Sequence, residues 1–270
     1  MKDNYLRVGT TYFKKSLYPT LSGDRIEILL PWSPELIRQD HGKNALSLVE
    51  IFDGFICFPE NRLEFYLKNH QGYYNTYHSL SKNPIEGDIT NTKKFITHIF
   101  GEQTEIGFDY LQLLYLKPTQ ILPILCLVSK ERATGKSTFL KWLKEIFEYN
   151  LTYLTNDSFS SNFNADWASK LLICIDEVLF QTEILTERIK YLSTTNVNKI
   201  EAKGKDRKEI EFFGKFILCS NNETSFIKID ADEIRFWVRK IDSYEKEDVH
   251  FLSKLIKELS YTLSICLMSF

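Results

Sequence analysis

The 270-residue chain lacks three features that would place it in a special class: paired cysteines, long apolar runs and a strong net charge. None of its five cysteines forms a Cys-x-x-Cys pair, and most lie in apolar runs such as ILCLV and FILCS. This pattern excludes a disulfide framework and indicates buried thiols in a reducing compartment. The five histidines are scattered and show no metal-ligand spacing.

Membrane and export signals are missing as well. No apolar run approaches the roughly 18 residues that cross a bilayer, and the N-terminus, MKDNYLRVGT, is polar and shows no signal peptide. We therefore expect a cytoplasmic protein without a membrane partner. With a net charge of −2, the chain has no overall basic field to attract nucleic acid, so any such binding must come from a local patch.

What the chain does have is a globular composition, with 43% hydrophobic and 26% charged residues. The pattern of apolar and polar residues changes at the polar stretch HSLSKNPIEGDITNTKK, near residues 80–90. Before this stretch, short mixed segments predict a small α+β region over 1–85, of unknown role. After it, helix and buried-strand patterns alternate and predict an α/β core over 86–245, followed by a C-terminal helix over 246–270.

Within the core, the apolar patterns predict individual elements. Strands are expected at 124–128, 151–154, 171–175, 216–219 and 236–241. Helices are expected at 94–100, 108–115, 138–149, 184–192 and, as one amphipathic helix, 249–268. The charged segment 198–212 predicts a hairpin centred on Gly204.

The segment SKERATGKST, residues 129–138, ends like a phosphate-binding loop, G-x-x-x-x-G-K-[ST], although Lys130 replaces its first glycine. A buried strand precedes it and an amphipathic helix follows, so backbone N–H groups and the helix N-terminus can hold phosphates. Lys136 would reach the β- and γ-phosphates, and Ser137 would help to hold Mg²⁺. The predicted nucleotide-binding residues are Ala133, Thr134, Gly135, Lys136, Ser137 and Thr138. The alternative is a surface turn with a solvated lysine.

Two further apolar strands end in polar side chains. LLICIDEV ends in Asp176 and Glu177, and FILCSNN leads to Asn221. If Asp176 meets the phosphate loop from a neighbouring parallel strand, it can hold Mg²⁺, while Glu177 deprotonates a water. Asn221 would contact the γ-phosphate or that water. The alternatives are an ordinary strand exit and an asparagine turn.

Basic residues complete the pattern. Lys203, Lys205 and Arg207 cluster at the tip of the predicted hairpin, where they could reach the phosphates of single-stranded nucleic acid. The alternative is a solvated charged hairpin. Arg235 could act as an arginine finger in a neighbouring subunit's site. Alternatively, it pairs with Asp230, Asp232 or Glu233.

Along the chain, the order is a phosphate loop, a strand that ends in Asp-Glu, a basic hairpin and a strand that is followed by Asn. This order resembles that of superfamily 3 helicases of viruses and mobile elements. More closely, it resembles the helicase domain found beside primase-polymerase modules in phages. The resemblance rests on LPILCLVSKERATGKSTFL, DWASKLLICIDEV, IEAKGKDRKEIEFFGKFILCSNN and EIRFWVRKI, and it covers about residues 90–245. It implies an AAA+-like P-loop NTPase fold and a ring, usually a hexamer. ATP would lie between subunits, Arg235 would act in trans, and the 203–207 hairpin would pull single-stranded DNA through the channel.

The expected function is therefore that of a DNA helicase using ATP and Mg²⁺ in phage or mobile-element replication, with a primase or polymerase as a further partner. A phage-encoded chain would work in the cytoplasm of its bacterial host. Two alternatives stay open: a P-loop ATPase that remodels or loads a protein, and an inactive relic that serves as an oligomeric scaffold. Lys130 and Ala133 depart from the family pattern and motivate the second. The chain ends soon after its last core strand, so a fragment, a subdomain or a stand-alone partner of a separate primase all fit.

Overall fold

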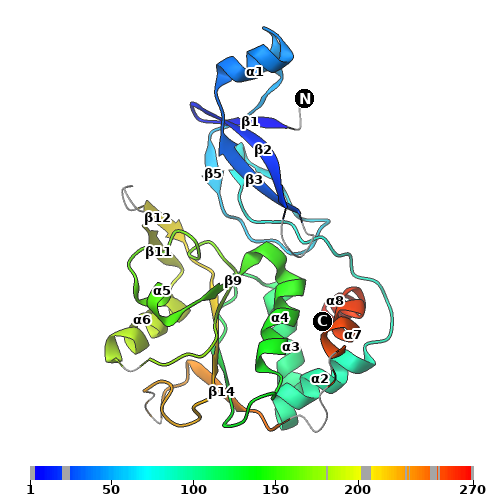
Figure 1. The fold of residues 1–270 in the computed structure, drawn as a ribbon, viewed down its shortest axis with the longest axis vertical. Helices are drawn as coiled ribbons and strands as arrows, with labels where there is room; N and C mark the ends of the chain where they lie inside the picture. Colours follow the sequence, from blue (N-terminus) through cyan, green and yellow to red (C-terminus); the bar gives the residue numbers. More distant parts are fainter. Residues whose placement is uncertain are drawn as a thin grey trace. The chain divides into compact units, whose positions relative to one another are not determined.

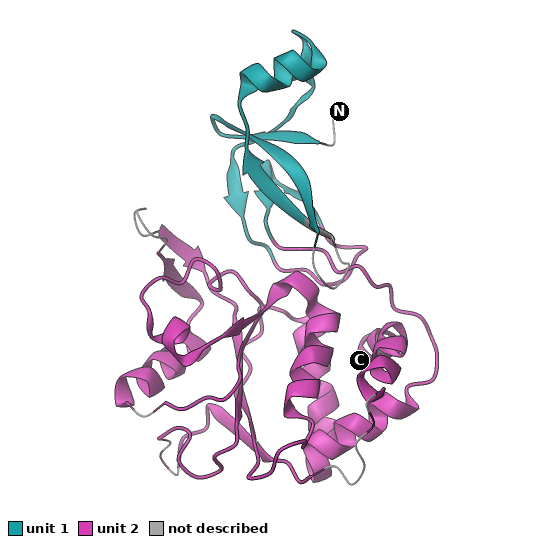
Figure 2. Ribbon diagram, in the orientation of Figure 1, with its two compact units in different colours: residues 1–58, 67–76 teal, residues 59–66, 77–270 magenta. Residues whose placement is uncertain are grey.

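The computed structural model describes residues 4–19, 25–180, 182–201, 208–228, 230, 232–243, 248 and 250–268 (Figure 1). The chain divides into two compact units (Figure 2). Unit 1 comprises Met1–Phe58 and Leu67–Thr76, and unit 2 comprises Pro59–Tyr66 and Tyr77–Phe270. Residues 59–66 and 77–85, which the sequence analysis assigned to the N-terminal region, therefore belong to the same unit as the core.

Unit 1 is a small α+β region. Its four-stranded sheet has the order β3-β2-β1-β4, with β1 Tyr5–Val8, β2 Thr11–Pro19, β3 Arg25–Pro31 and β4 Glu50–Phe52. A second sheet has the order β5-β7-β6, with β5 Gly54–Ile56, β6 Asn69–His70 and β7 Tyr73–Asn75. The alternation of β1 divides its buried side chains between two clusters. Tyr5 packs with Ile37 of α1 (Pro34–His41), whereas Leu6 and Val8 pack with Tyr74.

The core of unit 2 is a five-stranded, all-parallel sheet in the order β14-β8-β13-β10-β9. The strands are β8 Ile124–Val128, β9 Leu151–Leu154, β10 Leu172–Ile175, β13 Lys215–Ser220 and β14 Phe236–Lys240. Every residue of β8, β10 and β13 is buried, as expected for central strands of a sheet covered on both faces. The predicted α/β fold with a central parallel sheet is confirmed.

Helices cover both faces of this sheet (Figure 1). On one face, Phe159 of α5 (Asn156–Ser160) and Ile189 of α6 (Glu183–Thr194) join a core cluster with the strands. On the other face lie α3 (Thr104–Leu116) and α4 (Lys136–Phe147), flanked by α2 (Thr90–Phe100). The apolar residues of α4, which predicted a helix over 138–149, form its buried face.

The tail differs from the predicted single helix. It forms two helices, α7 (Phe251–Lys257) and α8 (Leu259–Met268), with Glu258 between them. The buried Glu258 carboxylate accepts hydrogen bonds from the Thr92 N–H (2.7 Å) and the Asn91 N–H (3.1 Å) at the start of α2. Burial alone would raise the pKa of Glu258, but these hydrogen bonds bring it below its ordinary value. Glu258, at the junction of α7 and α8, thus accepts from the first-turn N–H groups of α2, where the helix dipole favours a carboxylate.

The predicted hairpin is present as the antiparallel pair β11 (Val197–Ile200) and β12 (Lys208–Glu211). Its tip, residues 202–207, lies outside the described residues. Residues 212–214 connect β12 directly to β13, the central strand of the core sheet. The hairpin stem and the core sheet are thus consecutive in the chain.

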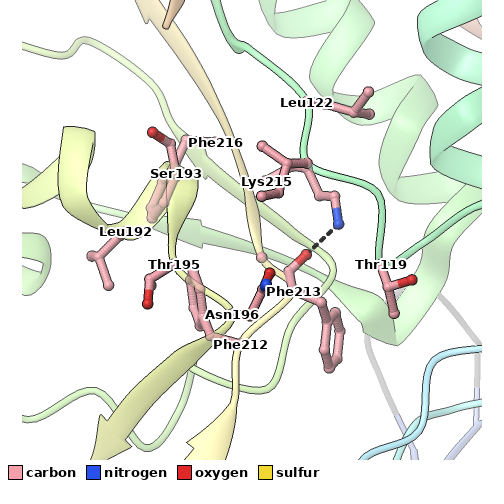
Figure 3. Close-up of a pocket in the computed structure, with 12 residues that line it drawn as sticks. Thr119, Leu122, Leu192, Ser193, Thr195, Asn196, Phe212, Phe213, Lys215 and Phe216 are labelled. Atoms are coloured by element: carbon pink, nitrogen blue, oxygen red, sulfur yellow. Dashed lines mark hydrogen bonds between the residues drawn. The ribbon is translucent and has the colours of Figure 1, made fainter.

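A buried lysine lies where the hairpin joins the sheet. Lys215 lines a small cavity at the amino end of β13, and its Nζ donates to the Phe213 carbonyl at 2.6 Å (Figure 3) and to the Pro118 carbonyl. Only 4% of Lys215 is exposed, and burial lowers its pKa to about 7. The folded protein therefore keeps this amine out of water, which favours its neutral form.

The Lys215 pKa predicts a pH dependence of stability. Between about pH 7 and the ordinary lysine pKa, the unfolded chain binds a proton that the folded chain does not, so the free energy of unfolding rises with pH, by at most about 1.4 kcal/mol per unit. In Lys215→Met this contribution is absent. Urea unfolding at pH 7, 8 and 9 should show the wild-type value rising relative to the variant. Lys141→Met, at an exposed position of α4, should keep the wild-type slope, and an unchanged slope in Lys215→Met would contradict the prediction.

Candidate functional site

The segment between β8 and α4 forms a loop over residues 129–135 that ends at the N-terminus of α4. Gly135 caps this helix with φ +91°, and an added Cβ would lie 3.2 Å from the Phe95 ring, so glycine is required here. Ala133 also has a positive φ, of 56°. Lys130 does not have a positive φ, and its N–H donates to Glu223 at 2.9 Å. The missing first glycine is therefore compatible with the loop, because the backbone at position 130 does not need it.

Lys136 is the first residue of α4 and is 7% exposed. Its Nζ donates to Ser129 Oγ and to Thr134 Oγ1, the latter at 3.2 Å, so the side chain folds back against its own loop. His98 of α2 contacts the same loop, with its Nε2 3.0 Å from the Thr134 carbonyl. Burial lowers the pKa of Lys136, although the carboxylates of Asp176 and Glu223 act in the opposite direction.

Asp176 and Glu177 follow β10, and Asp176 Oδ2 accepts a hydrogen bond from Ser137 Oγ at 3.2 Å. The expectation that β10 neighbours the loop strand is wrong. β13 lies between β8 and β10, and Asn221 follows β13. The acids reach the loop across one intervening strand because helix α4 begins over the same edge of the sheet. Asn221 takes the place between them.

These groups line one cleft with a volume of about 390 Å³. Its lining residues are Arg132, Ala133, Thr134, Gly135, Lys136, Ser137, Thr138, Asp176, Glu177 and Asn221. All six predicted nucleotide-binding residues, both carboxylates and the amide are therefore brought together. Arg132 also lines the cleft, and the sequence analysis did not single it out.

Glu177 is held in an unusual conformation by a residue that the sequence analysis missed. Its φ is +58°, which is strained for a non-glycine residue and typical of functional sites. Asn156, the first residue of α5 and two positions after β9, donates from Nδ2 to the Glu177 carbonyl (3.2 Å) and accepts from the Leu179 N–H (3.2 Å). One amide thus holds both sides of the strained turn. The available signal was the same as for Asn221, a polar amide just past an apolar strand.

Arg235 lies at the opposite end of the sheet. Its carbonyl accepts from the N–H of Ile124, the first residue of β8, whereas the loop follows the last residue of that strand. Its side chain pairs with Glu233 (2.7 Å), one of the partners considered from the sequence, and Glu233 also contacts Lys190 at 3.5 Å. Arg235 does not line the cleft of its own chain. The predicted DNA-binding residues Lys203, Lys205 and Arg207 lie outside the described residues.

The cleft offers a sparse set of metal ligands. Within the described ranges, no group of three or more His, Cys, Asp or Glu side chains could hold a metal ion. The Ser137 hydroxyl and Asp176 carboxylate, 3.2 Å apart, instead match the few protein oxygens that Mg²⁺ uses when substrate phosphates and water fill its other positions. The residues present therefore fit Mg²⁺ held together with a phosphate substrate.

Comparisons with known proteins agree on the fold. A family described as "Family of unknown function (DUF5906)" matches residues 127–239. An apo structure of the NrS-1 C-terminal region (305–718) aligns with a TM-score of 0.72 at 16% sequence identity, over 98% of this chain and 66% of that one. The A form of the apo NrS-1 C-terminal region aligns with a TM-score of 0.73 at 18% identity, over the same shares. The chain thus spans 66% of the length of these neighbours.

More distant comparisons add little. A JCV helicase structure aligns with a TM-score of 0.41 at 13% identity, over 66% of this chain and 53% of that one. None of the curated proteins matches the chain in sequence. In the part of the chain that the structure describes, no helix has the length and apolarity to span a membrane. The site's chemistry must therefore be argued from the cleft itself.

The left-handed conformation of Ala133 predicts a stabilising substitution. Ala133→Gly should raise the free energy of unfolding by about 1 kcal/mol, because relief of backbone strain exceeds the entropy that glycine adds to the unfolded chain. Thermal unfolding followed by circular dichroism would measure it. The matched control is Ala165→Gly, at an exposed position without positive φ, which should destabilise slightly. Equal effects of the two substitutions would show that the strain is not there.

The Asn156 amide predicts a local change in protection. Asn156→Ala should accelerate hydrogen exchange of the Leu179 amide by about tenfold, since that N–H loses its acceptor. Asn156→Asp keeps the acceptor oxygen and should preserve more of the protection. Exchange of the Phe180 amide, which donates to the Phe226 carbonyl, serves as the internal reference. Unchanged Leu179 exchange in Asn156→Ala would contradict the proposed contact.

Proposed function

We propose that the chain is an ATP-dependent DNA helicase of the superfamily 3 type, coupling ATP hydrolysis to translocation on single-stranded DNA. The observation that carries the proposal is the convergence of Lys136, the Ser137–Asp176 pair, Glu177 and Asn221 on one cleft. These groups come from the carboxyl ends of two parallel strands, β10 and β13, and from α4, the helix that follows a third, β8. This is where open α/β sheets bind ligands.

ATP binding follows from the loop. The N–H groups before α4 and the positive end of that helix favour the phosphates. Lys136, at the start of α4, would exchange its hydrogen bonds to Ser129 and Thr134 of the loop for contacts with the β- and γ-phosphates. Ser137 and Asp176 would hold Mg²⁺, which would supply positive charge that stabilises the phosphates.

Hydrolysis follows from the other wall of the cleft. Glu177 accepts a proton from a water whose oxygen attacks the γ-phosphorus. The bond from that phosphorus to the β,γ-bridging oxygen breaks, and ADP and inorganic phosphate form. Asn221, between the loop and the acids, orients the water or the γ-phosphate. Asn156 fixes the backbone on which Glu177 stands.

The DNA-coupled part of the proposal rests on the hairpin and on assembly. Lys203, Lys205 and Arg207 would contact the phosphates of single-stranded DNA, and β12 leads from this tip into the strand that ends at Asn221. Arg235, remote from its own cleft, would act only on a neighbouring copy, as in a hexameric ring. A primase or polymerase would supply the wider replication context.

The test is ATP hydrolysis by the purified chain with and without single-stranded DNA. We expect turnover that rises with DNA and falls at least a hundredfold in Lys136→Ala and in Glu177→Gln, because these remove phosphate binding and the general base. Combined replacement of Lys203, Lys205 and Arg207 by alanine should remove the stimulation by DNA. Lys141→Ala, on the exposed side of α4, is the matched control and should behave as wild type.

Two other outcomes separate the alternatives. Turnover indifferent to DNA, and unchanged in the hairpin variant, would favour an ATPase that remodels or loads a protein. No turnover in a folded, oligomeric preparation would favour an inactive scaffold. Either result would overturn the helicase proposal.

A further inference from the structure

Arg132 is a cation on the phosphate loop for which the described residues supply no ion pair. It is exposed and lines the cleft with Lys136, Asp176 and Glu177. No carboxylate in the described part of the chain pairs with it. Two other cations of unit 2, Arg235 and Lys240, are each paired with a glutamate. The guanidinium of Arg132 therefore keeps its hydrogen-bonding capacity for a ligand.

Arg132 belongs to the loop that precedes the N-terminus of α4, where phosphates would bind. It precedes two loop residues with positive φ, Ala133 and Gly135, and these turns wrap the backbone around the space in front of α4. The same cleft is lined by Lys136, which begins α4, and by Glu177, which follows β10. Arg132 therefore shares one cleft with the lysine and the carboxylate to which the proposed ATPase function assigns phosphate binding and water activation.

Charge supports the same conclusion. The cleft lining contains two cations, Arg132 and Lys136, and two carboxylates, Asp176 and Glu177, so it is formally neutral. Without Arg132 the lining would carry a net negative charge, which opposes binding of a polyanion. A guanidinium also offers paired N–H donors, the geometry that matches two oxygens of one phosphate.

We propose that Arg132 binds the terminal phosphate of a nucleoside triphosphate within its own chain and stabilises the transition state of its hydrolysis. The inference rests on the proposed ATPase function and assigns to this chain's own loop a guanidinium that Arg235 could supply only to a neighbour. As the water oxygen bonds to the γ-phosphorus, the bond to the bridging oxygen breaks and its electron pair stays with ADP. Arg132 donates to the γ-phosphate oxygens, while the proton of the water passes to Glu177.

Two consequences distinguish this role from general electrostatic attraction. Arg132 should discriminate a triphosphate from a diphosphate, because only the triphosphate presents the terminal phosphate. It should also contribute to turnover more than to binding, because its donors strengthen as the transition state forms.

The experiment compares Arg132→Ala and Arg132→Lys with wild type, with Arg38→Ala on α1 of unit 1 as the matched control. Steady-state kinetics should show kcat at least a hundredfold lower in Arg132→Ala, with partial recovery in Arg132→Lys. Titration with Mg·ADP should change by less than threefold, whereas Mg·ADP with aluminium fluoride, which mimics the transferring phosphoryl group, should bind at least tenfold more weakly. Thermal unfolding should confirm that the variants are folded, as expected for an exposed side chain.

The failures are separable. Wild-type turnover that Arg132→Ala reduces by less than threefold would overturn this inference and leave the ATPase function in place. Equal weakening of Mg·ADP and of the aluminium fluoride complex would also overturn it, by showing unspecific attraction. Wild-type protein that binds neither nucleotide form would overturn the proposed function and this inference together.

Discussion

All five strands of the core sheet run in the same direction, so the chain leaves each of these strands at the same edge of the sheet. Buried side chains, most of them apolar, fix the central strands β8, β10 and β13, and a polar residue follows directly after each of the three. The loop after β8, the acids after β10, Asn221 after β13 and Asn156 after β9 therefore meet without any long-range adjustment of the chain. The packing of the sheet thus determines where the polar side chains of the cleft lie.

Two of the four non-glycine residues with positive φ in the described part of the chain lie at this edge. Ala133 and Glu177 both adopt positive φ, one on each wall of the cleft. Hydrogen bonds surround the second of them, since Val178 donates to the Cys219 carbonyl and Asn156 holds the residues on either side. Backbone conformations of this kind persist only where neighbouring contacts over-determine them. The backbone conformation of Glu177 thus depends on hydrogen bonds from Asn156 and from the neighbouring strand.

Much of this arrangement can be predicted from the sequence, because short, fully apolar runs such as ILCLV already define the strands and the polar residues that follow them. The lateral order of the strands cannot, since it depends on which surfaces pack together, and so β13 was not expected between β8 and β10. The break at Glu258 depends on a partner, Thr92, that is distant in sequence. Asn156 gave only the weak signal of one amide after a strand, and the roles of Lys203, Lys205 and Arg207 remain sequence-based predictions.

The continuity of β12, residues 212–214 and β13 gives the sheet a mechanical property. β13 has six residues, about 20 Å of extended backbone, and is hydrogen-bonded on both sides. Such a strand resists stretching and bending, and it connects residues 212–214, which follow the hairpin, to Asn221. At the hairpin end of β13, Lys215 Nζ donates hydrogen bonds to the Pro118 and Phe213 carbonyls. The path through the chain from the hairpin to Asn221 is therefore short and lies within the hydrogen-bonded centre of the sheet.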